Sequence, residues 1–410
     1  MGLLLKLLAI IVLSIAVIFF APGIPPHNLQ FEAYTLESPL PLEGKLANNN
    51  ILDKAEEIKV DREFQGPESI AFRGDEIFTG LIGGELVRIK NGKSTTIIEK
   101  TKNNKPCEGS WDVKNCGRIA GLRFGFDGKL YVADAANGIF KVDVDAGSVE
   151  TLASCDVEID GKRPLYPDDL DVGKDGSVYW SDASTVADVQ NTLFEFLGSG
   201  TGRLIKYDPK TKKNTVLISS MHFSNGVQLS ENEDFVLVTE TARARVLRYY
   251  LKGETKGKSD IFIDRLPGLP DNVRPNGKGG FYIVLISPRV ASEVSLVDLI
   301  GPLPLVRRFI CRILHLVVAS LQFVDSFFPS TVTREWIAYV QHVGPLGDLE
   351  KLPYKSIVVE TDGTGNIIGS LQNEKGPVTG LSEIRLDKEY AYLGSPAQRK
   401  MFRIKREFLK

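Results

Sequence analysis

The sequence predicts an all-β protein, a six-bladed β-propeller that carries an N-terminal transmembrane helix and a helical insertion in its fifth blade. Three observations in this chain of 410 residues predict that fold: β-rich runs recur about every 50 residues, the N-terminus is apolar, and one repeat is stretched. A period of about 50 residues fits a four-stranded propeller blade. Six repeats around a central channel leave only short, protected sheet edges.

The repeats share one order of strands and turns. Each begins with a short strand, continues through a polar turn such as FDGK, KDGS or SENED, and reaches a β-branched or aromatic strand such as KLYVADA or SVYWSDA. The six first strands align at Pro67 (PESIAF), Arg118 (RIAGLRF), Pro167 (PDDLDV), Ser224 (SNGVQL), Pro270 (PDNVRP) and Val378 (VTGLSEI). We therefore expect the propeller to occupy residues 57–410.

The apolar segment Leu3–Phe20 predicts a membrane anchor. Its length of about 18 residues spans roughly 27 Å as a helix, close to the hydrocarbon core of a bilayer. A cleaved signal peptide is the alternative, but cleavage favours small residues before the cut, and here Phe19 is bulky and Pro22 follows. Lys6 and the terminal amine lie on the N-terminal side of the span, and no Lys or Arg follows it until Lys45, so we expect a single-pass type II protein.

This topology divides the chain into a cytoplasmic tip and signal anchor (1–21), a proline- and asparagine-rich stalk (22–56) and a lumenal or extracellular propeller, at the plasma membrane or endoplasmic reticulum. The fifth repeat is stretched by residues 294–343, which have a helical pattern. Cations lie among the apolar residues there, at Arg307, Arg308, Arg312 and His315. They argue against a second span and favour an amphipathic helix, which covers the channel or contacts membrane lipid. Burial against the outer rim is the alternative.

Charge and cysteine content narrow the partners and the compartment. The formal net charge of -2 gives no electrostatic reason to expect nucleic acid. Cys107 and Cys116 bracket the polar loop EGSWDVKN and suit a disulfide in an oxidising compartment, with four buried thiols as the alternative. We expect Cys155 and Cys311 to be unpaired.

Carboxylates and amides recur at the same phase of four repeats. They are Glu68, Asp168 with Asp169, Asn225, and Asp271 with Asn272. G-x-S-x-G, H-E-x-x-H and P-loop motifs are missing from the sequence, and it has only 4 histidines. Taken singly, each of these residues would fit an ordinary turn, because Asp and Asn are common turn residues. Because they recur where inner strands begin, we expect their oxygens to converge on a hard cation, best a calcium ion.

The motifs GPESIAF, CGRIAGLRFGFDGKLYVADA, YPDDLDV, FSNGVQLSENEDFVLVTET and LPGLPDNVRP resemble the strictosidine-synthase-like propellers, and more distantly the paraoxonases and calcium-dependent gluconolactonases. The resemblance implies that Glu68, Asn225 and Asp271 bind the metal, and that Asn272 is a further ligand or orients substrate. Asp168 stands where relatives often have asparagine, so its charge should tighten calcium binding and weaken Lewis acidity. Cys107 and Cys116 correspond to the pair of cysteines that, in the family, fixes the loop before the CGR motif.

Two departures limit the transfer of function. Ala120 stands where paraoxonases have a histidine. Ser382 aligns with the glutamate of true strictosidine synthases, and Glu383 is one step away, on the opposite face of the strand. Strictosidine synthesis is therefore not expected.

The predicted function is calcium-dependent hydrolysis of small lipophilic esters or lactones, with arylesterase-like activity. The ion would polarise the carbonyl, Asp271 or Asp168 would activate water, and Asn272 would orient the substrate. The main alternative is a non-catalytic cell-surface binding or adhesion propeller in which calcium is structural. A third reading is lipid transfer or sensing through the helices of 294–342.

Overall fold

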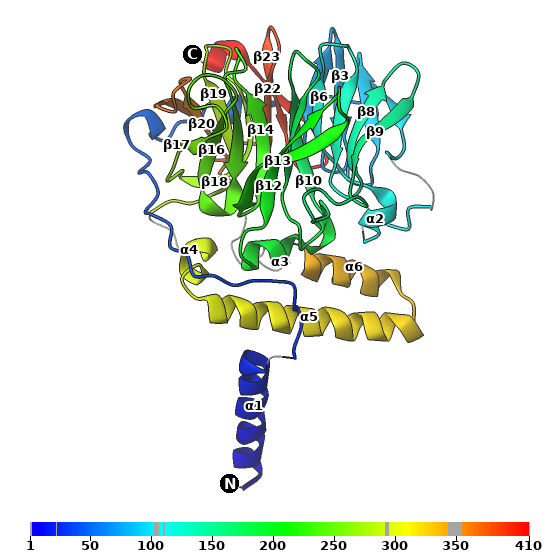
Figure 1. Ribbon diagram of the computed structural model, residues 1–410, viewed down its shortest axis with the longest axis vertical. Helices are drawn as coiled ribbons and strands as arrows, with labels where there is room; N and C mark the ends of the chain where they lie inside the picture. Colours follow the sequence, from blue (N-terminus) through cyan, green and yellow to red (C-terminus); the bar gives the residue numbers. More distant parts are fainter. Residues whose placement is uncertain are drawn as a thin grey trace.

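The computed structural model describes residues 2–21, 23–101, 106–109, 111–291, 295–342 and 355–409. The protein is mainly β, with six four-stranded antiparallel sheets (Figure 1). The innermost strand of each sheet contacts the innermost strands of its two neighbours, and the last, β22, contacts the first, β2. The sheets therefore close into a circle, consistent with a six-bladed β-propeller.

Five sheets consist of four strands that follow one another in the chain. The first sheet contains β2 (Ile70–Arg73), β3 (Glu76–Gly80), β4 (Leu86–Lys90) and β5 (Lys93–Ile98). The second contains β6 (Ile119–Phe124), β7 (Leu130–Asp134), β8 (Gly138–Asp143) and β9 (Ser148–Ser154). The third contains β10 (Pro167–Val172), β11 (Val178–Asp182), β12 (Gly202–Asp208) and β13 (Lys213–Met221). The fourth contains β14 (Ser224–Leu229), β15 (Phe235–Glu240), β16 (Arg245–Tyr250) and β17 (Ser259–Ile263). The fifth contains β18 (Gly268–Pro275), β19 (Phe281–Pro288), β20 (Ile357–Thr361) and β21 (Ile367–Gln372).

The sixth sheet joins the two ends of the propeller. It contains β22 (Glu383–Leu386), β23 (Tyr390–Gly394), β24 (Phe402–Lys405) and, outermost, β1 (Glu56–Glu57). Glu56 pairs with Arg403 across the ladder, and their side chains form an ion pair of 2.8 Å. The chain thus closes its circle by adding an early strand to the last blade. The sequence analysis did not foresee this closure.

The cores lie between neighbouring sheets. Trp180 is fully buried, and it packs with Leu170 and Ile205 of its own sheet against Tyr131 and Ile139 of the preceding one. Side chains alternate between the two faces of a strand, so each sheet contributes apolar residues to both neighbouring cores. This arrangement explains why the sequence shows runs of β-branched and aromatic residues and little strict apolar–polar alternation.

The α-helices are α1 (Gly2–Phe20), α2 (Val113–Cys116), α3 (Thr192–Leu197), α4 (Leu296–Ile300), α5 (Pro304–Phe327) and α6 (Thr331–Gln341). Short 3-10 helices are η1 (Gly44–Leu46), η2 (Leu52–Lys54), η3 (Val189–Asn191), η4 (Thr241–Arg243) and η5 (Arg406–Leu409). Helices α4 to α6 lie between β19 and β20, which confirms the insertion in the fifth blade, although the predicted end points 294 and 343 lie outside the described residues. In Figure 1, α3 to α6 lie at one end of the sheets and α1 projects from that end.

The segment between α1 and β1 packs on the propeller. Leu46 and Leu52 are buried in two of the inter-sheet cores. The Tyr34 ring lies against His222, with the guanidinium of Arg243 at 4.2 Å and that of Arg307 at 4.9 Å from its centre. The predicted stalk is therefore fastened to the sheets along its length, while the exact boundaries of the predicted domains stay predictions.

Candidate functional site

The predicted site residues of three strands lie in β-bulges. The pairing register shifts within β10, β14 and β18. The residues inside these shifts are Asp168 and Asp169, Asn225 and Gly226, and Asp271 and Asn272. A bulge takes residues out of the regular ladder and turns their side chains in a new direction. Strands that would otherwise present only backbone edges toward the propeller axis can therefore direct oxygen atoms there.

Close packing brings these bulges side by side. A Cβ atom on Gly226 would lie 2.6 Å from Cα of Asn272, and one on Gly121 would lie 2.8 Å from the carbonyl oxygen of Asp168. Glycine at these positions lets the inner strands approach closely. Since Glu68 lies two residues before the inner strand of the first blade, all the predicted site residues lie at one end of the propeller, where inner strands begin. We call Glu68, Asp168, Asn225, Asp271 and Asn272 the oxygen cluster.

One or two residues beyond the oxygen cluster along the inner strands, interactions link all six blades. We call this set the inner ring, and its members in blade order are Ser69, the Leu122 N–H, Asp169, the Val227 N–H, Arg274 and Glu383. The guanidinium of Arg274 donates to Asp169 and to Glu383, both at 2.7 Å. All three side chains are at most 1% exposed. The buried charges of the inner ring are therefore paired.

In the oxygen cluster, by contrast, buried oxygen atoms lack hydrogen-bond partners. Asn225 Oδ1, Asp271 Oδ1 and Asn272 Oδ1 are buried and make no hydrogen bond to any residue that the structure describes. Leaving a buried acceptor without a partner costs about 1–3 kcal/mol. Three such oxygens on two neighbouring strands indicate a place where a ligand supplies the missing partner.

The carboxyl groups of the oxygen cluster repel one another. Burial, followed by the negative charges of Glu68 and Asp168, raises the pKa of Asp271 well above its usual range. Burial, followed by the charge of Glu68, does the same to the pKa of Asp168. The pKa of Glu68 is also raised by burial, against the opposing effect of Arg118. For each of these three groups, from three blades, burial and the negative charges around it therefore favour the neutral form.

Arg118 supplies part of that charge, and the sequence analysis did not single it out. Its guanidinium donates to Glu68 Oε2 at 3.0 Å, and the ion pair is nearly buried. Burial lowers the pKa of Arg118, but the charges of Glu68, Tyr166 and Asp168 outweigh that effect and leave it raised. Arg118 immediately precedes β6, so its long side chain can reach the first blade.

Carboxylates alone do not form a metal site at this end of the propeller. Among the described residues, no group of three or more His, Cys, Asp or Glu side chains is placed so as to hold a metal ion. The amides of Asn225 and Asn272 would add two donors, and the carboxylate of Glu68 is turned toward Arg118. All donors of the cluster are oxygens, two of them amide oxygens without partners. The chemistry fits calcium, provided that Glu68 turns away from Arg118.

Aromatic side chains surround this end of the propeller. Tyr166 meets Phe223 edge to face at 5.3 Å, and Phe196 of α3 stacks on Phe223 at 4.7 Å. Ala120, which stands where the paraoxonases have a histidine, is buried in the same cluster. A small apolar group would fit these surroundings better than a charged one.

One histidine lies near the oxygen cluster although the sequence analysis set the histidines aside. His342 follows α6, and burial together with the positive charge of Arg118 lowers its pKa to about 4. The insertion therefore brings an imidazole close to Arg118. Only the folded insertion could show this, since His342 lies 224 positions after Arg118 in the chain.

Glu383 and Ser382 contact different partners. The carboxylate of Glu383 belongs to the inner ring and accepts hydrogen bonds from Arg274 and Ser69. The hydroxyl of Ser382 points at the backbone oxygens of Glu68 and Gly394. The assignment of Ser382 and Glu383 to opposite faces of the strand stays a prediction, and β22 begins at Glu383.

The predicted disulfide is confirmed. Cys107 and Cys116 are bonded, with their Cα atoms 4.7 Å apart. Cys116 ends α2, directly before Gly117 and Arg118. The disulfide therefore fixes the loop that leads to Arg118, and Cys155 and Cys311 stay as thiols.

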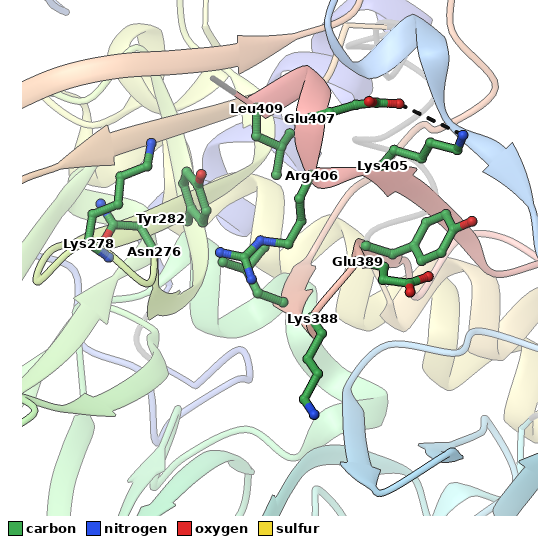
Figure 2. Close-up of a pocket in the computed structure, with 11 residues that line it drawn as sticks. Asn276, Lys278, Tyr282, Lys388, Glu389, Lys405, Arg406, Glu407 and Leu409 are labelled. Carbon is green, nitrogen blue, oxygen red and sulfur yellow. Dashed lines mark hydrogen bonds and ion pairs between the residues drawn. The ribbon is translucent and has the colours of Figure 1, made fainter.

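A cavity of about 570 Å³ opens at the other end of the propeller (Figure 2). Its lining includes Asn276 and Leu386, which lie where inner strands end. Two of its cations have carboxylate neighbours: Lys405 lies 3.8 Å from Glu407, and Lys278 lies 3.1 Å from Glu360. Lys388 and Arg406 also line the cavity, which lies away from the oxygen cluster.

Comparison with known families agrees with the sequence resemblance. Residues 168–254 match the family described as strictosidine synthase, and residues 44–89 match the strictosidine synthase-like N-terminal family. The chain is 34% identical to the adipocyte plasma membrane-associated protein of Rattus norvegicus, over 89% of each chain. It is 34% identical to that of Homo sapiens, over 93% of this chain and 83% of the relative. It is also 33% identical to the Drosophila melanogaster relative called Hemomucin, over 95% and 67%.

Solved structures share the fold. A gluconolactonase of Xanthomonas campestris superposes with a TM-score of 0.52 at 13% identity, over 94% of this chain and 99% of that one. The calcium-binding protein regucalcin of Agrobacterium tumefaciens superposes with a TM-score of 0.50 at 13% identity, over 84% and 90%. At such low identity the likeness concerns the propeller fold alone.

Proposed function

Because the chain belongs to the strictosidine synthase-like family, as a homologue of the adipocyte plasma membrane-associated proteins, we propose that it is a membrane-anchored, calcium-dependent hydrolase of esters or lactones with arylesterase-like activity. The observation that carries this proposal is the set of three buried side-chain oxygens without partners, on Asn225, Asp271 and Asn272. They lie beside carboxyl groups that repel one another. Such a group of oxygens suits a hard divalent cation.

Glu68, Asp168, Asn225, Asp271 and Asn272 would hold the calcium ion. When bound, the ion would offset their negative charge and polarise a substrate carbonyl. The fold shared with a gluconolactonase and with a calcium-binding regucalcin supports a cation in this kind of propeller, at the level of fold. Glu68 would exchange its bond to Arg118 for the cation, which leaves the Arg118 guanidinium as a donor for a developing oxyanion.

Hydrolysis also needs a group that accepts a proton from water. Asp271 or Asp168 would take that proton as the water oxygen bonds to the carbonyl carbon, and would return it to the departing alkoxide oxygen. Water and ester thus become acid and alcohol with no other reactant. The amide of Asn272 would orient the substrate. Tyr166, Phe196 and Phe223 favour small lipophilic substrates.

The membrane anchor in this proposal is α1. Its apolar side chains are exposed, among them Leu5, Leu13 and Phe20, each at least 65%. A helix with such side chains in contact with water would aggregate, whereas lipid would cover them. The names of the relatives place them at the plasma membrane, which supports the same location for this chain. We propose a single-pass type II arrangement with the propeller outside the cytoplasm.

The test is hydrolysis of phenyl acetate by the full chain in detergent, with calcium and with excess chelator. We expect Glu68→Gln and Asn225→Ala to lower the calcium-dependent rate by about a hundredfold or more, as loss of a transition-state contact does. Glu407→Gln, an exposed carboxylate at the other end, serves as control and should retain the rate. Equal rates with calcium and with chelator would refute the proposal.

A second candidate function is a non-catalytic cell-surface binding or adhesion propeller with structural calcium. The ion pair between Arg118 and Glu68 favours the non-catalytic part of this candidate, since it joins the first and second blades and engages Glu68 in a structural contact. Ala120 in place of the paraoxonase histidine also favours it. In that case calcium raises the melting temperature of the pure protein, while aryl esters and lactones are not hydrolysed above the rate of a metal-free control.

A further inference from the structure

Helix α5 exposes an apolar face on the side away from the sheets. The exposed large side chains of this helix are Leu305, Leu316, Val317, Phe323, Val324 and Phe327. At 3.6 residues per turn they fall within an arc of about 120°. The buried residues Arg307, Cys311 and Val318 lie on the opposite side. A contiguous apolar surface of this kind is rarely left to water.

Contacts with the propeller fix which side of α5 faces outward. Arg307, fully buried, donates to the carbonyl oxygens of Leu197 and Gly198 at 3.0 and 2.9 Å. These carbonyls lie at the end of α3, whose Phe196 stacks on Phe223, directly before β14. By length and composition α5 could cross a membrane. Crossing would break these buried bonds and leave a guanidinium in hydrocarbon, so α5 lies across the end of the propeller.

The end of α1 is attached to the outward side of α5. Arg312 donates to the carbonyl oxygens of Ile18 and Phe19, at 2.7 and 3.1 Å. The Phe19 ring stacks on Phe309 with centres 5.0 Å apart. The last carbonyls of α1 thus receive a cationic donor, as helix ends require. Figure 1 shows α1 projecting from α5 in the direction away from the sheets.

We infer that the apolar face of α5 lies on the surface of the bilayer that α1 enters, so that the oxygen cluster is at the membrane-facing end of the propeller. The occupant of this face is lipid because α1, which needs lipid around its own side chains, leaves from the same side of α5. Amphipathic helices at the interface bury apolar side chains in this manner. The inference rests on α1 as the anchor but not on calcium binding or hydrolysis.

Two exposed phenylalanines provide a matched test. Phe323 on α5 is 67% exposed, and Phe126, in the turn after β6 at the other end of the propeller, is 72% exposed. In a Trp336→Phe background, the full chain carrying Phe323→Trp or Phe126→Trp is reconstituted in phosphatidylcholine vesicles with brominated acyl chains. Brominated lipid should quench the fluorescence added by Phe323→Trp and spare that added by Phe126→Trp. Acrylamide in the aqueous phase should do the reverse.

Each other outcome overturns the inference. If acrylamide quenches the Phe323→Trp signal as strongly as that of Phe126→Trp, the face of α5 is in water. If neither reagent quenches it, a second copy or another protein covers the face. Resistance of the protein to alkaline extraction from the vesicles tests α1 alone, so failure of the anchor is recognised separately.

Discussion

Neighbouring residues of the same strands form the oxygen cluster and the inner ring, and they differ in one respect. In the inner ring, Arg274 donates to both Asp169 and Glu383, and Arg123 lies 3.8 Å from Asp169, so two cations face the two buried carboxylates. The oxygen cluster contains more acidic groups and unpartnered amide oxygens than its one cation, Arg118, can satisfy. A step of one or two residues along an inner strand thus separates a network of ion pairs from a cluster that lacks donors.

The difference between the oxygen cluster and the inner ring indicates which of the two binds a ligand. Acidic residues at an axis are not in themselves a metal site, because an arginine can occupy the same position permanently. Asp169 and Asp168 are adjacent and equally buried, yet the cations Arg274 and Arg123 lower the pKa of Asp169 in spite of burial, whereas the pKa of Asp168 is raised. The informative observation is the imbalance between buried oxygens and their donors.

The largest expected effect on stability is that of a substitution in the inner ring. Arg274→Met would leave Asp169 and Glu383 buried without their cation, and should lower the free energy of unfolding by about 3–5 kcal/mol. Urea unfolding of the full chain measures it, with Arg399→Met, 70% exposed in its side chain, as control. A loss no larger than that of Arg399→Met would show that the inner ring does not stabilise the closed circle.

Glu195 shows how burial acts on the pKa of a carboxyl group that does not belong to the oxygen cluster. Glu195 lies outside the oxygen cluster, and burial raises its pKa to about 8 although Ser184 and Thr201 donate to it. Between pH of about 4.5 and 8 the unfolded chain releases this proton and the folded chain keeps it. Stability therefore falls as pH rises through this window, by up to about 1.4 kcal/mol per pH unit.

Replacing that carboxyl should remove this part of the pH dependence. We expect the melting temperature of Glu195→Gln to fall less than that of the parent between pH 5 and 8, and to be the higher of the two at pH 8. Thermal unfolding at both pH values measures the difference. Parallel curves for parent and variant would mean that Glu195 titrates normally.

Arg118 should weaken the binding of calcium. Arg118→Met removes a positive charge beside the proposed cation and releases Glu68, so the dissociation constant for calcium should fall by about tenfold, or about 1.4 kcal/mol. Arg118→Lys retains the charge and should change affinity less. Calcium titration followed by melting temperature measures both variants. Weaker binding by Arg118→Met would make Arg118 a supporting residue of the site.

The smallest expected effect on stability is that of a substitution in the oxygen cluster of the metal-free protein. Asp271→Asn removes one of three mutually repelling carboxyls, so the metal-free protein should be as stable as the parent, within about 1 kcal/mol, or more stable. The same variant should lose the stabilisation that calcium gives. A destabilisation as large as that of Arg274→Met would place Asp271 in a network like the inner ring.

Much of the fold could be predicted because the repeats carry local signals. Inner strands that begin with PDDLDV and SNGVQL form β10 and β14 within the same limits. The pairing of β1 with β24 could not be predicted, since Glu56 and Glu57 carry no strand pattern and their partner lies at the other end of the chain. The fold supplies that partner only after the circle forms.

The oxygen donors could be proposed from the sequence because short side chains near the axis stay where the backbone puts them. Arg118, Arg274 and His342 could not, for two reasons. A long arginine side chain chooses among carboxylates of several blades, and only the folded circle shows that Arg118 takes Glu68 while Arg274 takes Asp169 and Glu383. His342 reaches the site on an insertion whose placement the repeats do not determine.

The most direct test of the central claim is calorimetric titration of the full chain with calcium chloride after metal removal. The unpartnered oxygens of the cluster predict that one calcium ion binds per chain, and that Asn225→Ala abolishes the binding. No calcium binding by the parent protein, or unchanged binding by Asn225→Ala, would contradict the claim.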